Sequence, residues 1–308
     1  MSRRRSEPTA NAPRGLVIAL DGPASSGKSS VGAAAAKQLG YRFCDTGLLY
    51  RAVTWLALAR GIVATAHDAL VPLVAEIELL DVGDGRLAHV AIDKVDRTDD
   101  VRSPEVDVAV SAYSAVAELR LALLERQRAL ALPGRIIMAG RDVGTIVLPD
   151  ADLKLYLDAS VEERARRRAD ERGVDPLGAA GREIFDELQR RDLLDSTREV
   201  APLRAAPDAV VIRTDGNAFD QTVAAVVEVI RATEIRQGQG PETAPPLPVS
   251  RPKRGPAPAP EPQSEPAPRV EPAPGPAPAS EPAPAPESAR VGRPDRADRP
   301  ERADRPER

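Results

Sequence analysis

Gly22-Pro23-Ala24-Ser25-Ser26-Gly27-Lys28-Ser29 is the stretch that decides the fold of this chain. Its spacing, a glycine, four residues and then Gly-Lys-Ser, is that of the phosphate-binding loop. An apolar run over 16–20 precedes it and an alanine-rich run over 30–39 follows it, which predicts a strand, the loop and a helix in that order. A glycine turn with a surface lysine is the alternative, but these flanking elements favour a loop that binds a nucleoside triphosphate.

Two residues of the loop carry the chemistry that this motif requires. The Lys28 ammonium would reach the β- and γ-phosphates, and the Ser29 hydroxyl would ligate Mg2+. The glycines let backbone N–H groups turn inward toward phosphate oxygens, and the positive end of the following helix adds to the attraction. The motif therefore predicts nucleotide binding and leaves the reaction open.

Composition restricts the class of protein. The chain has 308 residues, a formal net charge of −4 and one cysteine, Cys44, which indicates no polyanion binding, no intramolecular disulfide and no cysteine-based zinc site. No apolar run is long enough to span a membrane, and residues 1–13 lack the apolar middle of a signal peptide. We therefore expect a cytoplasmic protein with no nucleic-acid or membrane partner, and we expect it to be a monomer.

Both ends of the chain differ from its middle. Residues 1–14 are expected to form a flexible arm, and residues 237–308 are rich in Pro, Ala, Glu and Arg with almost no large apolar side chains. Such a segment cannot bury a core, so we expect a disordered tail. A tail without a specific partner and an interaction tail both fit this composition. The folded domain is then expected over 15–236.

Predicted strands and helices alternate along this domain, which is typical of an α/β fold with a parallel sheet and helices on both faces. The expected strands are 16–20, 41–44, 135–139, 153–157 and 209–212. The expected helices are 30–39, 48–60, 103–132, 160–172, 182–195 and 219–235, with a further amphipathic helix within 62–80. Asp84-Gly85 is a hairpin signal within a small antiparallel insert over 81–98. Ligands bind beyond the carboxyl ends of parallel strands, where the phosphate-binding loop, Asp45, Asp142 and Asp158 fall.

Three further stretches near predicted strand ends, 45–51, 140–145 and 190–198, are rich in arginine and aspartate. Arginine forks fit phosphate oxygens bidentately, so several arginines converging on one cleft indicate a phosphorylated acceptor. Surface ion pairs are the alternative. In the third stretch the polar residues continue an apolar helical face, as expected where a helix leaves the core and lines a cleft. That face consists of Ile184, Leu188, Arg191, Asp195 and Arg198.

Taken together, these motifs resemble the bacterial cytidylate kinase family, the nucleoside-monophosphate kinases that act on CMP and dCMP. The resemblance covers residues 15–235 and implies a five-stranded parallel P-loop sheet, a monophosphate-binding insert over about 62–103 and a lid over about 160–182. It also implies ATP as phosphoryl donor with Mg2+, and CDP or dCDP as product. The matching stretches are Gly22–Ser29, Asp45-Thr46-Gly47 with Tyr50-Arg51, Gly140-Arg141-Asp142 with Gly144-Thr145, and Arg191-Asp192 with Asp195 and Arg198.

The resemblance implies a role for individual residues. Cytosine would be read by Ser111, Arg120 and Asp142, and the CMP phosphate held by Arg51, Arg141 and Arg198. Arg191 and Asp195 would hold the ribose, and Thr46 and Tyr50 would line the same pocket. ATP would bind to Gly22, Pro23, Ala24, Ser25, Ser26, Gly27, Lys28, Ser29 and Ser30. Lys28 and the lid arginines Arg164 and Arg168 would be catalytic, although a solvated basic helix face is the alternative for the lid.

One pair of these residues conflicts with a single helix over 103–132. Ser111 and Arg120 are nine residues apart and would lie on opposite faces of one straight helix. Either the helix breaks between them, although the segment contains no proline, or one of the two assignments is wrong.

Two other functions remain open at this point. Another small-molecule P-loop kinase, for a different monophosphate or for shikimate, would share the loop. A GTP-binding switch protein is suggested only by Asp93-Lys94-Val95-Asp96, which resembles the guanine-reading Asn-Lys-x-Asp but has Asp in place of Asn.

Overall fold

The structure is a computed structural model that describes residues 15–81 and 83–238, so the predicted arm and nearly all of the predicted tail lie outside the described residues. The strands are β1 (Val17–Asp21), β2 (Arg42–Asp45), β3 (Ile77–Asp81), β4 (Arg86–Ile92), β5 (Val95–Asp96), β6 (Ile136–Gly140), β7 (Leu153–Asp158) and β8 (Val210–Arg213). The helices are α1 (Lys28–Leu39), α2 (Gly47–Ala59), α3 (His67–Leu70), α4 (Pro104–Ser114), α5 (Ala117–Ala131), α6 (Val161–Arg172), α7 (Ala179–Thr197) and α8 (Phe219–Arg236). Among these described helices none is long and apolar enough to cross a membrane.

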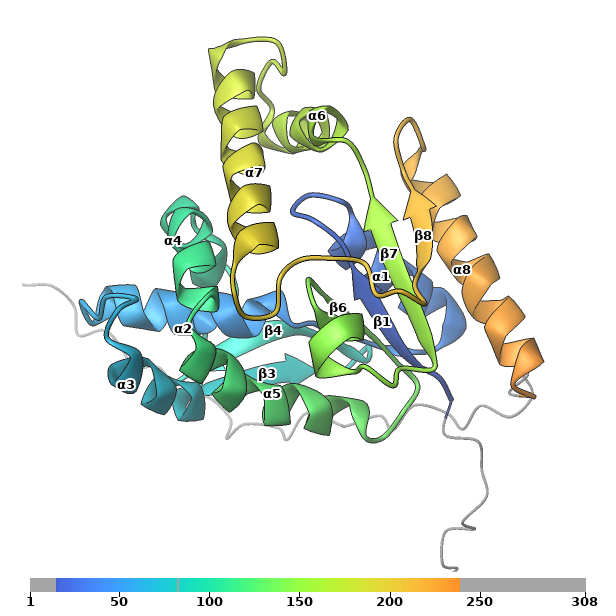
Figure 1. The fold of residues 1–308 in the computed structure, drawn as a ribbon, viewed down its shortest axis with the longest axis horizontal. Helices are drawn as coiled ribbons and strands as arrows, with labels where there is room; N and C mark the ends of the chain where they lie inside the picture. Colours follow the sequence, from blue (N-terminus) through green and yellow to red (C-terminus); the bar gives the residue numbers. More distant parts are fainter. Residues whose placement is uncertain (1–14, 82, 239–308) are drawn as a thin grey trace, which may run out of the picture. The chain divides into compact units, whose positions relative to one another are not determined.

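The predicted five-stranded parallel sheet is confirmed (Figure 1). Strands β2, β6, β1, β7 and β8 are neighbours in that order, and every pair among them is parallel. The central strand is buried on both faces: Ile18 and Leu20 pack with residues of α1 and α8, whereas Val17 and Ala19 pack on the opposite side in a cluster that includes Ala131 of α5. Helices therefore cover both faces of the sheet, as the alternation in the sequence predicts.

The antiparallel insert is present, but it is continuous with the main sheet. β3 and β4 form an antiparallel pair, and β4 also pairs in parallel with β2, so the insert extends the sheet at one edge. The amphipathic helix expected within 62–80 is only partly correct. After α3 a short 3-10 helix covers Val71–Glu76, and β3 begins at Ile77. β3 pairs with β4 along its whole length, from Ile77 opposite Ile92 to Asp81 opposite Leu87, so the end of this segment is a strand.

The helix expected over 103–132 is broken, and this resolves the conflict between Ser111 and Arg120. α4 ends at Ser114 and α5 begins at Ala117, because Val116 between them is extended with φ −69° and ψ 118°. Arg120 Nη1 donates to the carbonyl oxygen of Ser114 at 3.0 Å and so satisfies a free end of α4 without any proline. Ser111 and Arg120 are both buried beside the same cavity.

The phosphate-binding loop is held tightly against β7. Gly22 has φ +157°, and a Cβ there would lie 2.4 Å from the carbonyl oxygen of Leu157 and 2.8 Å from Ser26 Oγ. Gly27, directly before α1, has φ +87°, a conformation that L side chains rarely adopt. These two glycines let the loop turn back between β1 and α1.

Replacing the first of them tests this packing. We expect Gly22→Ala to lower the free energy of unfolding by about 2 kcal/mol, because the new methyl group meets a backbone oxygen that cannot move aside alone. Gly178→Ala is the control, since its Cβ would meet only ordinary contacts at 3.4 Å. Urea denaturation of both variants measures the difference, and equal stability of the two would contradict the account.

Candidate functional site

One cavity of about 1130 Å3 lies at the carboxyl ends of the parallel strands, and residues of α6 and α7 are among those that line it. Figure 1 shows both helices beyond that edge of the sheet. Its lining includes the loop residues from Ala24 to Ser30 and all of the residues assigned from sequence to the acceptor nucleotide. The latter are Thr46, Tyr50, Arg51, Ser111, Arg120, Arg141, Asp142, Arg191, Asp195 and Arg198. Segments from six parts of the chain thus meet in one space. Of the other assigned residues, Gly22, Pro23 and Arg164 are not among those that line it.

Lys28 lies inside this cavity with its ammonium held by its own loop. Lys28 Nζ donates to the carbonyl oxygen of Pro23 at 2.8 Å, and the residue is 6% exposed. Burial and the neighbouring guanidinium of Arg141 lower the pKa of the Lys28 ammonium well below its ordinary value. An anion among these groups would be attracted by both cations at once.

A hydroxyl and a carboxylate lie together at the mouth of the loop. Ser29 Oγ donates to Asp45 Oδ2 at 2.8 Å, while Asp45 Oδ1 accepts from Gly47 N at 3.0 Å. Asp45 comes directly from the end of β2, and Ser29 from the first turn of α1. This places two oxygen ligands next to the expected position of the triphosphate.

A buried carboxylate between two arginines forms the far end of the cavity. Asp142 Oδ2 accepts from Arg120 Nη2, and Arg198 Nη2 lies 3.6 Å from Asp142 Oδ1. The Arg120 guanidinium also lies over the ring of Tyr50, 5.2 Å from its centroid. Ser111 lines the cavity from α4. Acceptors and donors are thus fixed side by side on buried side chains, which suits recognition of a polar base.

A second carboxylate organises the middle of the cavity. Asp195 Oδ2 accepts from Arg141 Nε at 2.9 Å. Burial alone would raise the pKa of the Asp195 carboxyl, but Arg141, Arg198 and Arg191 hold it below its ordinary value. Burial and repulsion from Arg141 and Arg51 lower the pKa of Arg191 to about 10. Positive charge is therefore concentrated here and only partly neutralised.

Asp21 ties the phosphate-binding loop to the segment that carries Arg141 and Asp142. Its carboxylate at the end of β1 accepts from Val143 N at 2.8 Å and from Gly144 N at 2.7 Å. Burial raises the pKa of Asp21 to about 6, although these two N–H groups act in the opposite direction. Donor and acceptor regions are thereby held at a fixed separation.

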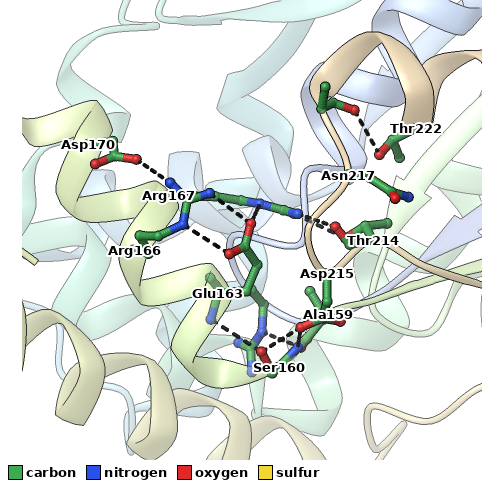
Figure 2. A network of polar contacts seen from close by, with 12 residues as sticks. Ala159, Ser160, Glu163, Arg166, Arg167, Asp170, Thr214, Asp215, Asn217 and Thr222 are labelled. Atoms are coloured by element: carbon green, nitrogen blue, oxygen red, sulfur yellow. Dashed lines mark hydrogen bonds and ion pairs between the residues drawn. The ribbon is translucent and has the colours of Figure 1, made fainter.

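The helix α6 is attached to the phosphate-binding loop and α7 through Arg164 and to the loop after β8 through Arg167. Arg164 is 4% exposed and donates to the Ala24 carbonyl at 3.1 Å and to Asp192 Oδ2 at 2.5 Å, which differs from the phosphate contact expected for it. Figure 2 shows Arg167 reaching from the lid to Thr214 in the loop after β8; Arg167 Nη1 donates to Thr214 Oγ1 at 3.0 Å. Arg167 and Arg168 both line the cavity, whereas Arg164 does not.

Several residues that line the cavity were not predicted from the sequence. Asp107 of α4 is the most prominent, since it is 4% exposed and contacts three arginines. An acidic residue in the first turn of a helix looks like an ordinary response to the helix dipole, so no local pattern could reveal it. The loop after β8 and the start of α8 also line the cavity, through Asn217, Ala218, Phe219 and Thr222. Arg86 and Arg102 line it from the insert and from the turn before α4.

The segment that suggested guanine recognition is a tight turn. Asp93 and Lys94 have φ of 51° and 66° and connect β4 to β5. Neither residue, nor Asp96, is among those lining the cavity. The described residues therefore give the GTP-switch interpretation no support.

The fold and the cavity define a P-loop kinase, with a phosphate-binding loop and an arginine-rich acceptor region under one lid. Residues 18–232 match the family model described as Cytidylate kinase, and the chain belongs to that family, which makes it a nucleoside-monophosphate kinase. It is 45% identical over 218 residues to the cytidylate kinase of Enterococcus faecalis, covering 70% of this chain and 96% of that protein. It is 43% identical over 219 residues to the cytidylate kinase of Geobacillus kaustophilus, and the match covers 70% of this chain and 97% of that protein. A bifunctional pantoate ligase/cytidylate kinase of a Synechococcus species is 42% identical over 217 residues, 42% of its own length.

The pair Arg120–Asp142 makes a testable contribution to stability. We expect Arg120→Met to lower the free energy of unfolding by about 3 kcal/mol, because it leaves a buried carboxylate without its closest partner. The double variant Arg120→Met/Asp142→Asn removes that charge as well and should regain part of the loss. Urea denaturation of both measures this, and a double variant no more stable than the single one would contradict it.

The depressed pKa of Asp195 predicts a pH dependence of stability. Because the folded-state pKa lies below the unfolded value, the unfolded chain takes up the proton first as the pH falls. The stability that Asp195 contributes is therefore present at neutral pH and lost as the pH falls through and below 3.8, the ordinary pKa of an aspartate. Between pH 5 and pH 3 the wild type should lose more unfolding free energy than Asp195→Asn. Parallel pH curves for the two proteins would refute this.

Proposed function

We propose that this protein transfers the γ-phosphoryl group of ATP to the 5′-phosphate of CMP or dCMP, giving ADP and CDP or dCDP. The observation that carries the proposal is the single cavity in which the phosphate-binding loop and the ten acceptor residues meet. The donor nucleotide would lie along the residues from Gly22 to Ser30. Its base would lie toward Asn217 and Phe219, which line the same cavity.

The residues present fit Mg2+ bound together with ATP. Ser29 Oγ and Asp45 Oδ2, 2.8 Å apart, are oxygen ligands of the kind that this ion prefers. The described residues contain no group of three or more His, Cys, Asp or Glu side chains that could hold a metal, which agrees with an ion held chiefly by phosphate oxygens. When bound, Mg2+ would offset negative charge on the phosphates.

The acceptor nucleotide would occupy the arginine-rich part of the cavity. Asp142 would accept from the cytosine amino group, while Arg120 and Ser111 would donate to its ring nitrogen and carbonyl oxygen. We assign the CMP phosphate to Arg51, Arg141 and Arg198, and the ribose to Arg191 and Asp195. Thr46 and Tyr50 would complete the wall of this pocket.

Catalysis would depend on position and charge. The acceptor phosphate is already an anion at neutral pH, so in-line attack on the γ-phosphorus needs no strong general base. Lys28 and Arg168 would offset charge on the γ-phosphoryl group during transfer. Arg164 would act as a positioning residue, because its bonds to Ala24 and Asp192 join the lid to the phosphate-binding loop. The closed lid would exclude water and so limit ATP hydrolysis.

An acceptor panel tests this function. With ATP and Mg2+, we expect phosphorylation of CMP and dCMP with higher kcat/KM than of UMP or AMP. In Asp142→Asn the preference for CMP over UMP should fall by about 10- to 100-fold, because an amide can donate to the uracil carbonyl where the carboxylate cannot. Failure to form CDP would refute the function, and an unchanged preference in the variant would refute the placement of the base.

A further inference from the structure

Asp107 has no role in the reaction described so far, yet it lies at the centre of the acceptor arginines. Asp107 Oδ1 is 2.5 Å from Arg51 Nη2 and 3.5 Å from Arg191 Nη1, and Asp107 Oδ2 is 2.9 Å from Arg168 Nη2. These arginines come from α2, α7 and the lid helix α6, and Asp107 itself comes from α4. One carboxylate therefore joins four helices around the cavity.

The guanidinium groups around Asp107 are engaged as they would be by a phosphate. Arg51 uses Nη2 for Asp107 and Nη1 for the Val101 carbonyl at 3.3 Å. Arg168 uses Nη2 for Asp107 and Nη1 for Glu171 at 3.2 Å. A phosphate that binds to Arg51 would lie close to Asp107, because both anions would face the same guanidinium group.

The net charge of the arginines around Asp107 also favours binding of a phosphate. Three guanidinium groups share Asp107, and Glu171 also pairs with Arg168, so the cluster keeps about one uncompensated positive charge. Arg191 Nε is buried without a hydrogen-bond partner. A phosphate anion would be attracted by this remaining charge and by the free N–H group of Arg191.

We infer that Asp107 is a positioning residue that holds Arg51, Arg168 and Arg191 together and competes with the acceptor phosphate for Arg51. It keeps like-charged arginines assembled before substrate arrives, and it weakens binding of the acceptor because the two anions repel each other and share donors. This inference rests on the placement of the CMP phosphate proposed above. A purely structural ion pair would stabilise the fold without opposing the substrate.

The test is the near-isosteric variant Asp107→Asn, assayed by calorimetric titration with CMP and by steady-state kinetics. We expect the Kd for CMP to fall by about tenfold, because the repulsion is removed while the shape of the side chain is kept. The KM for ATP should stay within about twofold of the wild type, and the inhibition constant of inorganic sulfate against CMP should fall in parallel with the Kd. Thermal stability should decrease, because three arginines lose their shared partner.

Glu105→Gln is the matched control, because it removes the same charge from an exposed position of the same helix. It should leave the Kd for CMP unchanged. If Asp107→Asn fails to fold, Asp107→Ser keeps a hydroxyl acceptor and takes its place in the same titration. A Kd for CMP that is unchanged or raised in the folded variant overturns the inference, and so does an equal fall in Glu105→Gln.

Arg51→Gln separates this inference from the function on which it rests. If Arg51→Gln leaves the KM for CMP unchanged, the proposed placement of the phosphate is wrong. If Arg51→Gln raises that KM as expected while Asp107→Asn does not lower the Kd, only the role of Asp107 is wrong.

Discussion

Repulsion among buried cations is the constraint on which this site depends. Six cations line one cavity, and three of them, Lys28, Arg191 and Arg198, have pKa values lowered by burial and by neighbouring arginines. The other three are Arg51, Arg120 and Arg141. A cluster of this kind would push its members apart without counter-ions. Asp142, Asp195 and Asp107 supply them, and each is less than 10% exposed. The carboxylates thus keep the charge in place, and the excess that remains is what attracts phosphate.

The parallel sheet brings the segments that carry these residues to one edge. Parallel strands end at the same edge, so β1, β2, β6 and β7 deliver Asp21, Asp45, Gly140 and Asp158 to one side of the molecule. Asp21 then fixes the distance between the two nucleotide regions by accepting from Val143 N and Gly144 N. Rigid spacing matters for phosphoryl transfer, because the rate depends on holding donor and acceptor in line.

The lid is a small packed unit with limited attachments. Its apolar contacts are Ala165 and Ala169 of α6 against Ile184 and Leu188 of α7, together with Ala24 of the loop. Its polar attachments lie at Arg164, Arg167 and Ser160 on the donor side and at Arg168 on the acceptor side. The acceptor-side contact of α6 is the one between Arg168 and Asp107, so the same carboxylate that holds the arginines also connects α6 to α4.

Local sequence patterns by themselves determined the phosphate-binding loop, the five parallel strands and the motifs that identify the family. Those features are local: the spacing of Gly22 to Ser29 and the apolar runs need no knowledge of distant residues. The assembly of the ten acceptor residues around one cavity followed from the resemblance, and no single motif required it. Only the tertiary structure decided the break before α5, the buried position of Arg164 and the environment of Asp107. The last two depend on contacts between residues far apart in the chain, such as Arg168 with Asp107, and such contacts leave no periodic trace in the sequence. The break before α5 is local, but the segment has no proline to mark it.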